Sequence, residues 1–242
     1  MAVASPISKL FAFILLCSMA SIVSAQGSTT EPSGTWRWKY DMDGKTREDA
    51  VMLNLDNGKV TGAFQGVPEK PVDIKEAKFK DNQLSFTVEY KVKEQAVSLA
   101  FAGKIKKDDL EGTVTVTTEA GVEEYPWTPK RSVQLNDVVG QWDITIDADG
   151  NKLEPRMVIT KSDDALQAKY TVAEGTVVEA TGIKIRDNKL EFRIEATING
   201  RKIRADYSGR PYGNVMKGSI DYDLDGSVGE IDFTAKRQPA KK

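Results

Sequence analysis

The sequence has no histidine and a single cysteine, Cys17, and both shortages exclude whole classes of chemistry. A Ser-His-Asp triad, a Cys/His zinc site and an intrachain disulfide all need residues that this chain does not have. The sequence also has no basic stretch, because its 34 Lys and Arg residues are interspersed with 36 Asp and Glu residues, for a formal net charge of −2. We therefore expect no nucleic-acid partner, since neutralising phosphates requires a basic surface.

Residues 1–25 have the pattern of a secretory signal peptide. A short start with one lysine precedes an apolar run over residues 10–23, and Val23 and Ala25 provide a small-residue cleavage pattern. The run is short for a membrane span and is interrupted by serine. We expect cleavage after Ala25, an extracytoplasmic location (periplasmic or secreted) and no membrane span in the mature chain.

The rest of the chain contains two copies of one pattern. Residues 34–131 align with residues 140–237 at a constant offset of 106 residues, without any insertion. A period of this length indicates tandem domains rather than a solenoid of short repeats. The expected organisation is a signal peptide (1–25), a flexible segment (26–33), a first β-barrel repeat (34–131), a linker (132–139), a second β-barrel repeat (140–237) and a tail (238–242).

Within each copy, apolar residues alternate with Lys, Glu, Asp, Thr and Arg, which is typical of strands with one buried face. The clearest run contains Leu84, Phe86 and Val88, and dipeptides such as Asn57-Gly58 mark tight turns between the runs. We expect an all-β protein made of two tandem small antiparallel up-and-down β-barrels, with seven or eight short strands in each. Closure into a barrel removes exposed sheet edges, and a two-sheet sandwich is the alternative.

Each copy begins with a Gly-x-Trp motif, at Trp36 and Trp142, and ends with a basic pair that includes Arg131 or Arg237. This combination resembles the calycin group, which comprises lipocalins and related barrels. The wider pattern is similar to the tandem lipocalin-like domains of exported bacterial proteins of unknown function. The resemblance implies that each Arg packs across its Trp and closes the base of its barrel. An Arg guanidinium over an indole contributes about 0.5–2 kcal/mol, which favours barrel closure over ligand contact for these residues.

Large aromatic residues on the apolar faces are the candidates for lining a ligand pocket. They are Trp38, Tyr40, Phe86, Tyr90 and Phe101 in the first copy and Tyr170, Phe192 and Tyr207 in the second. The alternative is that they only fill the interior, because a barrel of about eight strands has just enough room for its own side chains. The short strands favour the filled interior.

The acids Asp221, Asp223 and Asp225, followed by Gly226, match the spacing of a calcium loop. A hairpin is the favoured interpretation, because apolar residues alternate with these acids and the equivalent segment of the first copy has a plain hairpin sequence. We find no acid in an apolar stretch that would raise its pKa, and no nucleophile motif. We therefore expect no metal, no cofactor and no enzymatic activity, with a hydrolase as a further alternative.

The predicted function is that of a non-enzymatic binding module for a small apolar ligand. The alternative is a structural or cell-envelope module that contacts a protein or a glycan and has filled barrels. A specific function is expected where the two copies differ. The differences are greatest in the connection between Pro68 and Pro71, the segment 125–127 and the acidic hairpin at Asp221.

Overall fold

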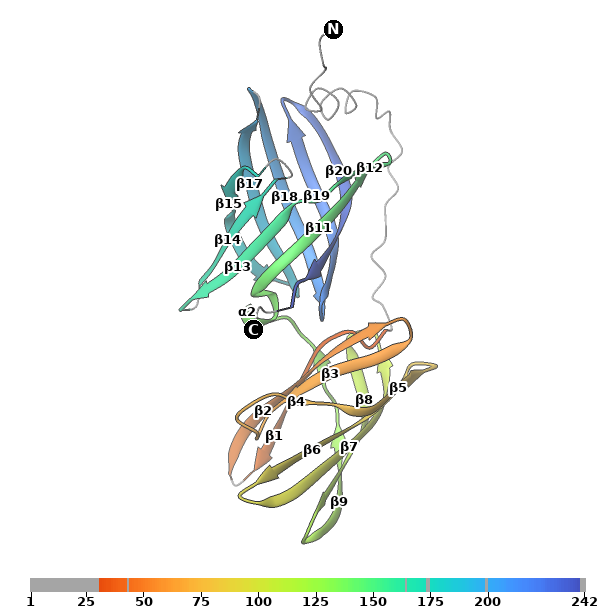
Figure 1. Cartoon of the computed structure of the whole chain (residues 1–242). Coiled ribbons are helices and arrows are strands. Elements are labelled where there is room, and N and C mark those ends of the chain that lie inside the picture. Colours follow the sequence, from red (N-terminus) through yellow and green to blue (C-terminus); the bar gives the residue numbers. More distant parts are fainter. Residues whose placement is uncertain (1–30, 43, 164, 173–174, 199, 240–242) are drawn as a thin grey trace.

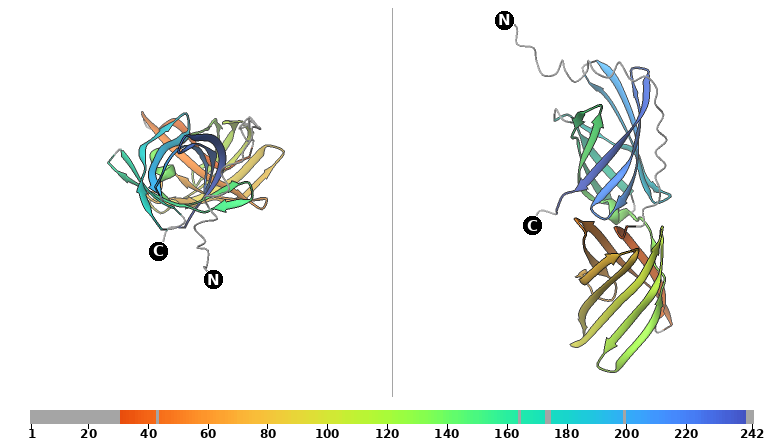
Figure 2. Two further views of the ribbon diagram at one scale, coloured as in Figure 1. Left: turned by 90° about the horizontal axis from the view of Figure 1, so that it is seen from above. Right: turned by 90° about the vertical axis from the view of Figure 1, so that its right-hand side faces the viewer.

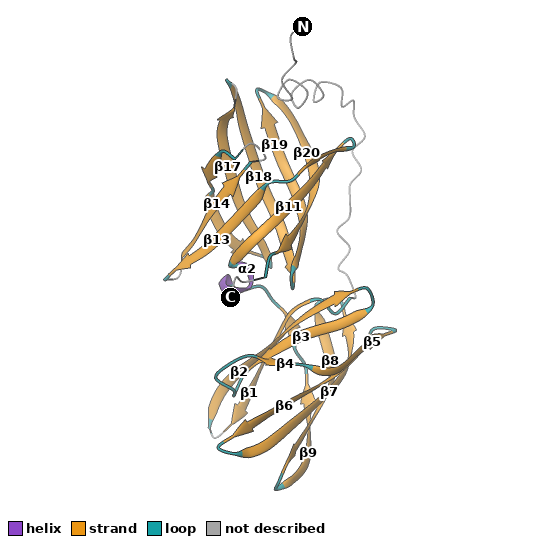
Figure 3. Ribbon diagram, viewed as in Figure 1, coloured by secondary structure: helices purple, strands orange, loops and turns teal. Residues whose placement is uncertain are grey.

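The computed structural model describes residues 31–42, 44–163, 165–172, 175–198 and 200–239. The predicted signal peptide lies outside the described residues. The described chain is all-β, with two separate antiparallel sheets and one short helix between them (Figures 1 and 3). No helix in the described ranges has the length and apolar character needed to cross a membrane.

The first sheet runs in the order β4-β3-β2-β1-β10-β8-β7-β6-β5, with β9 beside β8. Its strands are β1 (Gly34–Met42), β2 (Lys45–Asp56), β3 (Lys59–Gln65), β4 (Val72–Asp73), β5 (Lys75–Lys80), β6 (Gln83–Val92), β7 (Gln95–Lys106), β8 (Asp109–Thr118), β9 (Gly121–Trp127) and β10 (Lys130–Arg131). All pairs are antiparallel, and most join strands that are consecutive in the chain.

The second sheet runs in the order β15-β14-β13-β11-β20-β19-β18-β17-β16, with β12 beside β11. Its strands are β11 (Gly140–Ala148), β12 (Asn151–Leu153), β13 (Arg156–Ser162), β14 (Ala165–Thr171), β15 (Val177–Glu179), β16 (Thr181–Arg186), β17 (Lys189–Ile198), β18 (Arg201–Tyr212), β19 (Val215–Leu224) and β20 (Ser227–Arg237). In both sheets the first strand of the copy pairs with its last strand, as in an up-and-down arrangement.

In each sheet, the two end strands are successive parts of one chain segment. Only Ile74 separates β4, which pairs with β3, from β5, which pairs with β6. The Ile74 N–H donates to the Gly62 carbonyl at 3.0 Å, and in the second sheet the Ala180 N–H donates to the Ala168 carbonyl at 2.9 Å. The segment therefore joins the two edges of its sheet and curls the sheet around its apolar face.

The expectation of two closed barrels of short strands is confirmed only in a coarser form. There are two antiparallel sheets, and the second is nearly barrel-shaped when viewed along its axis (Figure 2). The strands are also longer than expected, since β2, β7 and β18 each contain 12 residues. Runs of this length arise because the polar outer residues extend each strand beyond its apolar core positions.

Each sheet encloses its own apolar core. The core of the first sheet is centred on Trp36, Phe64 and Phe101, and that of the second on Trp142 and Phe192. We call the end of a sheet at which its Gly-x-Trp motif lies the base, and the opposite end the open end.

The two bases face one another across the junction (Figure 2). Arg210 of β18 lies 2.8 Å from the Asp108 carboxylate of the first copy. The backbone N–H of Asn214 donates to the Asn54 side-chain oxygen at 2.7 Å. The two open ends therefore point away from each other.

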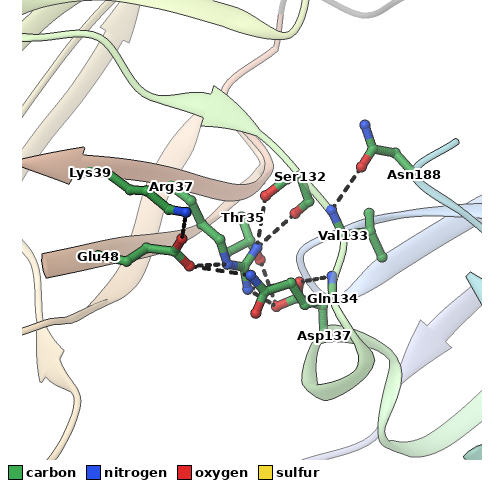
Figure 4. A network of polar contacts seen from close by, with 9 residues as sticks. All are labelled: Thr35, Arg37, Lys39, Glu48, Ser132, Val133, Gln134, Asp137 and Asn188. Atoms are coloured by element: carbon green, nitrogen blue, oxygen red, sulfur yellow. Dashed lines mark hydrogen bonds and ion pairs between the residues drawn. The ribbon is translucent and has the colours of Figure 1, made fainter. Parts of the chain in front are cut away.

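The helix α2 (Leu135–Val138) connects the two sheets through its own polar groups (Figure 4). Arg37 of β1 donates to both oxygens of the Asp137 carboxylate, at 2.9 and 3.0 Å, and to the Ser132 carbonyl at 2.8 Å. Val138 from the same helix is fully buried in the core of the second sheet. Val138 of this helical turn therefore packs in the second core, while Arg37 of the first sheet binds the neighbouring Asp137 carboxylate.

Candidate functional site

The predicted ligand-lining residues lie on the inward faces of the two sheets, but the structure divides them into two groups. Five are buried core residues: Phe86, Phe101, Tyr170, Phe192 and Tyr207. The other three, Trp38, Tyr40 and Tyr90, belong to the first sheet and remain partly exposed on its inward face. Only this second group is accessible from outside the sheet.

The buried aromatic residues of the first sheet pack tightly against one another. The ring of Phe101 lies 4.8 Å from that of Phe86 and 4.9 Å from that of Trp127, measured between ring centres. Trp38 covers this group, with its ring centre 5.7 Å from that of Phe101. These rings fill the part of the interior that Trp38 covers.

The most unusual residue at this level is Asp49 on β2, which the sequence analysis missed. Asp49 is 7% exposed and pairs directly with Trp38 of β1. Burial raises the pKa of the Asp49 carboxyl to about 6, although a hydrogen bond from Tyr40 and the charge of Arg47 act in the opposite direction. The expectation that no acid has a raised pKa is therefore wrong. Extending the alternation of β2 by one step beyond Val51 would have placed Asp49 on the inward face.

Two tyrosines and a glycine surround the Asp49 carboxyl. Burial, together with the charge and hydrogen bond of Asp49, raises the pKa of Tyr40 to about 12. Burial and the charge of Asp49 also raise the pKa of Tyr90. A Cβ on Gly66 would come within 2.5 Å of Asp49 Oδ1, so the bare backbone at this position makes room for the carboxyl. Both tyrosines stay neutral at pH 7, and they supply hydroxyl donors and ring faces beside a carboxylate.

Trp127 places a second polar group in the same interior. Its side chain is 1% exposed, and its indole N–H has no hydrogen-bond partner among the described residues. Leaving a buried donor unpaired costs about 1–3 kcal/mol, and folded proteins seldom retain one without a water molecule or a ligand to accept it.

The first sheet is also open along one side, next to Trp127. In the second sheet, β11 pairs with β20 over five residue pairs, whereas β1 pairs with β10 over two. Thr128 and Pro129 separate β9 from β10. Of these two strands, β10 pairs with both β1 and β8, whereas β9 pairs only with β8. Pro129 has no N–H group to donate to β8, although its carbonyl accepts the Leu110 N–H at 3.0 Å, and the second copy has Ala235 at this position. The β8–β9 hairpin projects from the lower end of the molecule in Figure 1.

The second interior also contains polar groups, but they bond to each other. The hydroxyl oxygens of Tyr170 and Tyr207 lie 2.5 Å apart. Burial raises the pKa of Tyr170 to about 12 and that of Tyr207 well above its usual value. This pair satisfies itself inside a filled core, so it presents no free group to a ligand.

The four residues predicted to close the barrels lie at the two bases. The guanidinium carbon of Arg131 is 4.6 Å from the centre of the Trp36 ring, and that of Arg237 is 4.5 Å from the Trp142 ring. Each indole N–H donates to a backbone carbonyl at 2.8 Å. These groups are bonded within the fold and lie at the opposite end of the sheet from Asp49 and Tyr40.

The acids that match a calcium loop form the end of the β19–β20 hairpin. Asp225 and Gly226 both have positive φ, and the Gly226 N–H donates to Asp223 Oδ1 at 2.7 Å. Asp225 Oδ1 accepts the Lys202 N–H at 2.8 Å. Among the described residues, no group of three or more His, Cys, Asp or Glu side chains converges as a metal site. A hollow of about 610 Å³ opens beside this hairpin and is lined by charges of both signs.

Comparison with known proteins gives no functional assignment. No family model and no curated protein matches the chain. A Bacteroides fragilis structure, provisionally described as an outer membrane protein, has 11% identity over 85% of this chain and 97% of its own, with a TM-score of 0.31. A protein of unknown function from the DUF3598 family of Nostoc punctiforme has 12% identity over 86% and 96%, also with a TM-score of 0.31. Similarity at this level is too low to transfer a function.

Proposed function

We propose that this protein is an exported, non-enzymatic binding module that holds a small molecule inside its first sheet. One observation carries the proposal: the first interior buries the Asp49 carboxyl and the unpaired Trp127 N–H. Neither group is needed to build the fold, because the second copy has Pro155 and Phe233 at these positions. Burying polar groups costs free energy, and an apolar interior with a few such groups is typical of a ligand site.

Access to this interior is supported by two features of the first sheet. Trp38, Tyr40 and Tyr90 are partly exposed although they face inward. Beside Trp127, β1 and β9 are also unpaired with each other, and we call this open side of the first sheet the seam. In the lipocalin-like architecture that we propose for both copies, the Trp–Arg pair closes the base, and the ligand enters from the opposite end. The second barrel then acts as a filled structural partner.

A binding role is favoured over hydrolysis because Asp49 stands alone. In the described part of the chain, it is the only acidic residue that is buried. Glycoside hydrolysis needs two carboxyl groups that face each other across the substrate. Asp49 has two tyrosines and an arginine around it instead.

Export is proposed from the signal-peptide pattern of residues 1–25. N-terminal sequencing of the protein purified from its own host is expected to begin at Gln26, in an extracytoplasmic fraction. Recovery of an unprocessed chain from the cytoplasm would contradict this part of the proposal.

The binding function is tested by native mass spectrometry of the protein purified from its own host. We expect a copurifying small molecule on the wild type and on the variant Tyr222→Ala, but not on Tyr90→Ala. Both tyrosines are half-buried and pack against the core of their own sheet, so they form a matched pair. A bare mass for all three proteins, with no thermal shift across a lipid and metabolite panel, would refute the function.

A second candidate function is a contact with an envelope protein or glycan, and the β8–β9 hairpin favours it. Val122 is 66% exposed and Tyr125 is 47% exposed on this projecting hairpin. Val228, the equivalent of Val122 in the second copy, is 75% exposed and provides a control. A photo-crosslinker at position 122, but not at position 228, is expected to capture a partner in intact host cells if this function holds.

A further inference from the structure

The Asp49 carboxylate lies in an apolar interior without a direct ionic partner. Arg47, two residues away along β2, acts on Asp49 through its charge, but the two form no ion pair in the described part of the chain. Tyr40 supplies one hydrogen bond to the carboxylate. A buried carboxylate gains strongly from a cation that approaches it in such a place, because water screens the interaction only weakly.

A wall of three aromatic rings stands beside this carboxylate. Phe64 lies in the middle, with the Tyr90 ring stacked on it at 6.3 Å and 16° and the Trp38 ring tilted against it at 6.1 Å and 34°. The three rings come from β3, β6 and β1, so the curvature of the sheet brings them together. Ring faces attract ammonium groups, and they also bury an apolar body.

We propose that the ligand of this site is an organic ammonium ion with an aromatic or apolar body, an inference that rests on the proposed function. The ammonium group contacts the Asp49 carboxylate and the partly exposed faces of Trp38 and Tyr90. The body of the ligand packs against the inward-facing rings of Trp38 and Tyr90. A neutral ligand of the same shape would bury the carboxylate further without pairing it, which disfavours its binding.

The second sheet provides an internal control for this assignment. At the positions of Asp49, Tyr40 and Tyr90, it has Pro155, Ile146 and Ala196. At these equivalent positions it therefore has neither the carboxylate nor the two tyrosines. We expect one ammonium site per chain, in the first sheet.

The inference is tested with three probes that share a phenyl body and differ in charge: 2-phenylethylamine, 2-phenylethanol and 3-phenylpropanoate. Their dissociation constants are measured on the full mature protein at pH 7.5 by calorimetry. We expect the amine to bind about tenfold more tightly than the alcohol, since a charge-assisted contact contributes about that factor. The carboxylate probe is expected to bind most weakly.

Two variants separate a specific contact from a general effect of charge. Asp49→Asn keeps the size of the side chain and is expected to make the amine and the alcohol bind with similar affinity. Glu123→Gln removes an exposed charge from the β8–β9 hairpin and is expected to leave the tenfold preference unchanged. Thermal melting of both variants checks that each one is folded.

Equal binding of the amine and the alcohol, or tightest binding of the carboxylate probe, would overturn the inference while leaving the proposed binding function intact. Binding of none of the three probes would also overturn it. The binding function itself fails only if the protein from its own host carries no small molecule and no compound in the panel shifts its melting temperature.

Discussion

The two sheets of this protein share their construction and differ in what they enclose. Both have the same strand order, and both place an Arg over the Trp of the first strand at the base. Both also carry a bulge at one equivalent position, where Glu76 and Gly182 have positive φ. In the second interior the buried hydroxyls of Tyr170 and Tyr207 bond to each other, whereas the first buries an acid and an unpaired N–H beside an open seam.

This difference separates residues that build the fold from residues that require another explanation. The two copies differ at most aligned positions, and five of the inward-facing or seam differences set the first interior apart from the second. They are Tyr40 (Ile146), Asp49 (Pro155), Tyr90 (Ala196), Trp127 (Phe233) and Pro129 (Ala235), with the residue of the second copy in parentheses. Since the second copy folds without them, they are the residues to which the proposed binding function is assigned.

The largest expected effect concerns the buried Trp at the base, which both sheets share. Trp36→Ala and Trp142→Ala each remove a fully buried indole at a base, and each is expected to cost about 3–5 kcal/mol of unfolding free energy. Hydrogen exchange read by mass spectrometry should show the loss of protection in the sheet that carries the change. Equal loss in both sheets would show that the two copies unfold as one unit and would break the comparison.

The next largest effect concerns the pH dependence of stability that Asp49 causes, which the second interior does not share. The folded-state pKa of about 6 lies above the ordinary value of 3.8 for an aspartate, so the folded state holds this proton more tightly than the unfolded chain does. The contribution of the Asp49 carboxyl to the free energy of unfolding is therefore largest below about pH 4, and it is lost as the pH rises through about 6. Asp49→Asn is expected to raise the unfolding free energy at pH 7.5 by about 1–3 kcal/mol and to change it little at pH 4.

Urea unfolding of the wild type and the variant across this pH range measures the effect as a difference between the two proteins. The pKa values of the two tyrosines that face Asp49, Tyr40 and Tyr90, are raised, so both stay neutral between pH 4 and 8 and do not obscure it. Glu123→Gln, at an exposed acid, should follow the wild type at every pH. A variant that is less stable than the wild type at pH 7.5 would contradict the assigned environment of Asp49.

A smaller effect is expected inside the second sheet. Tyr207→Phe removes one partner of the buried hydroxyl pair and leaves the Tyr170 hydroxyl unsatisfied, at a cost of about 1–3 kcal/mol. Adding Tyr170→Phe removes the stranded hydroxyl, so the double variant should be more stable than the single one. The first copy already has phenylalanine at both positions, Phe64 and Phe101. Chemical denaturation of the three proteins provides the comparison, and simple additivity of the two changes would contradict it.

The smallest effect concerns the seam. Pro129→Ala restores a backbone N–H where the last strand of the first sheet is broken, as in the second sheet. The gain of about one hydrogen bond is offset by the greater freedom of the unfolded chain, so the net change should stay below about 1 kcal/mol. Slower amide exchange over residues 127–131 is the expected signal. Pro126→Ala, within β9, serves as the control and should leave this exchange unchanged.

Much of the architecture was predictable because it repeats at short range in the sequence. The period-two alternation of apolar residues predicts strands, and the constant offset between the copies predicts that the two sheets are built alike. The closure of both sheets into barrels was predicted but is supported only for one nearly barrel-shaped sheet. A strand pattern does not reveal how many residue pairs join the first and last strands of a copy, because those strands are far apart in the chain. The structure gives five such pairs in the second sheet and two in the first.

The candidate site was harder to predict. Trp38, Tyr40 and Tyr90 were included among the candidates, but Phe64, Trp127 and Asp49 were not. An acid in a strand usually belongs to the solvated face. The burial of Asp49 depends on Trp38 and Tyr40 of β1 and on Gly66 after β3, which lie on two segments separate from its own strand β2. Likewise, the sequence contains Trp127 as one more core aromatic residue, and only its surroundings leave its N–H without a partner.

The sequence by itself determined that this chain is all-β, that its pattern repeats, and which chemistry its lack of histidine excludes. These properties follow from local periodicity and composition, which do not depend on distant contacts. Only the tertiary structure decided which sheet closes, which aromatic residues are buried, and that an acid lies among them. Those outcomes depend on how strands far apart in the chain meet, because desolvation and pairing are properties of the assembled interior.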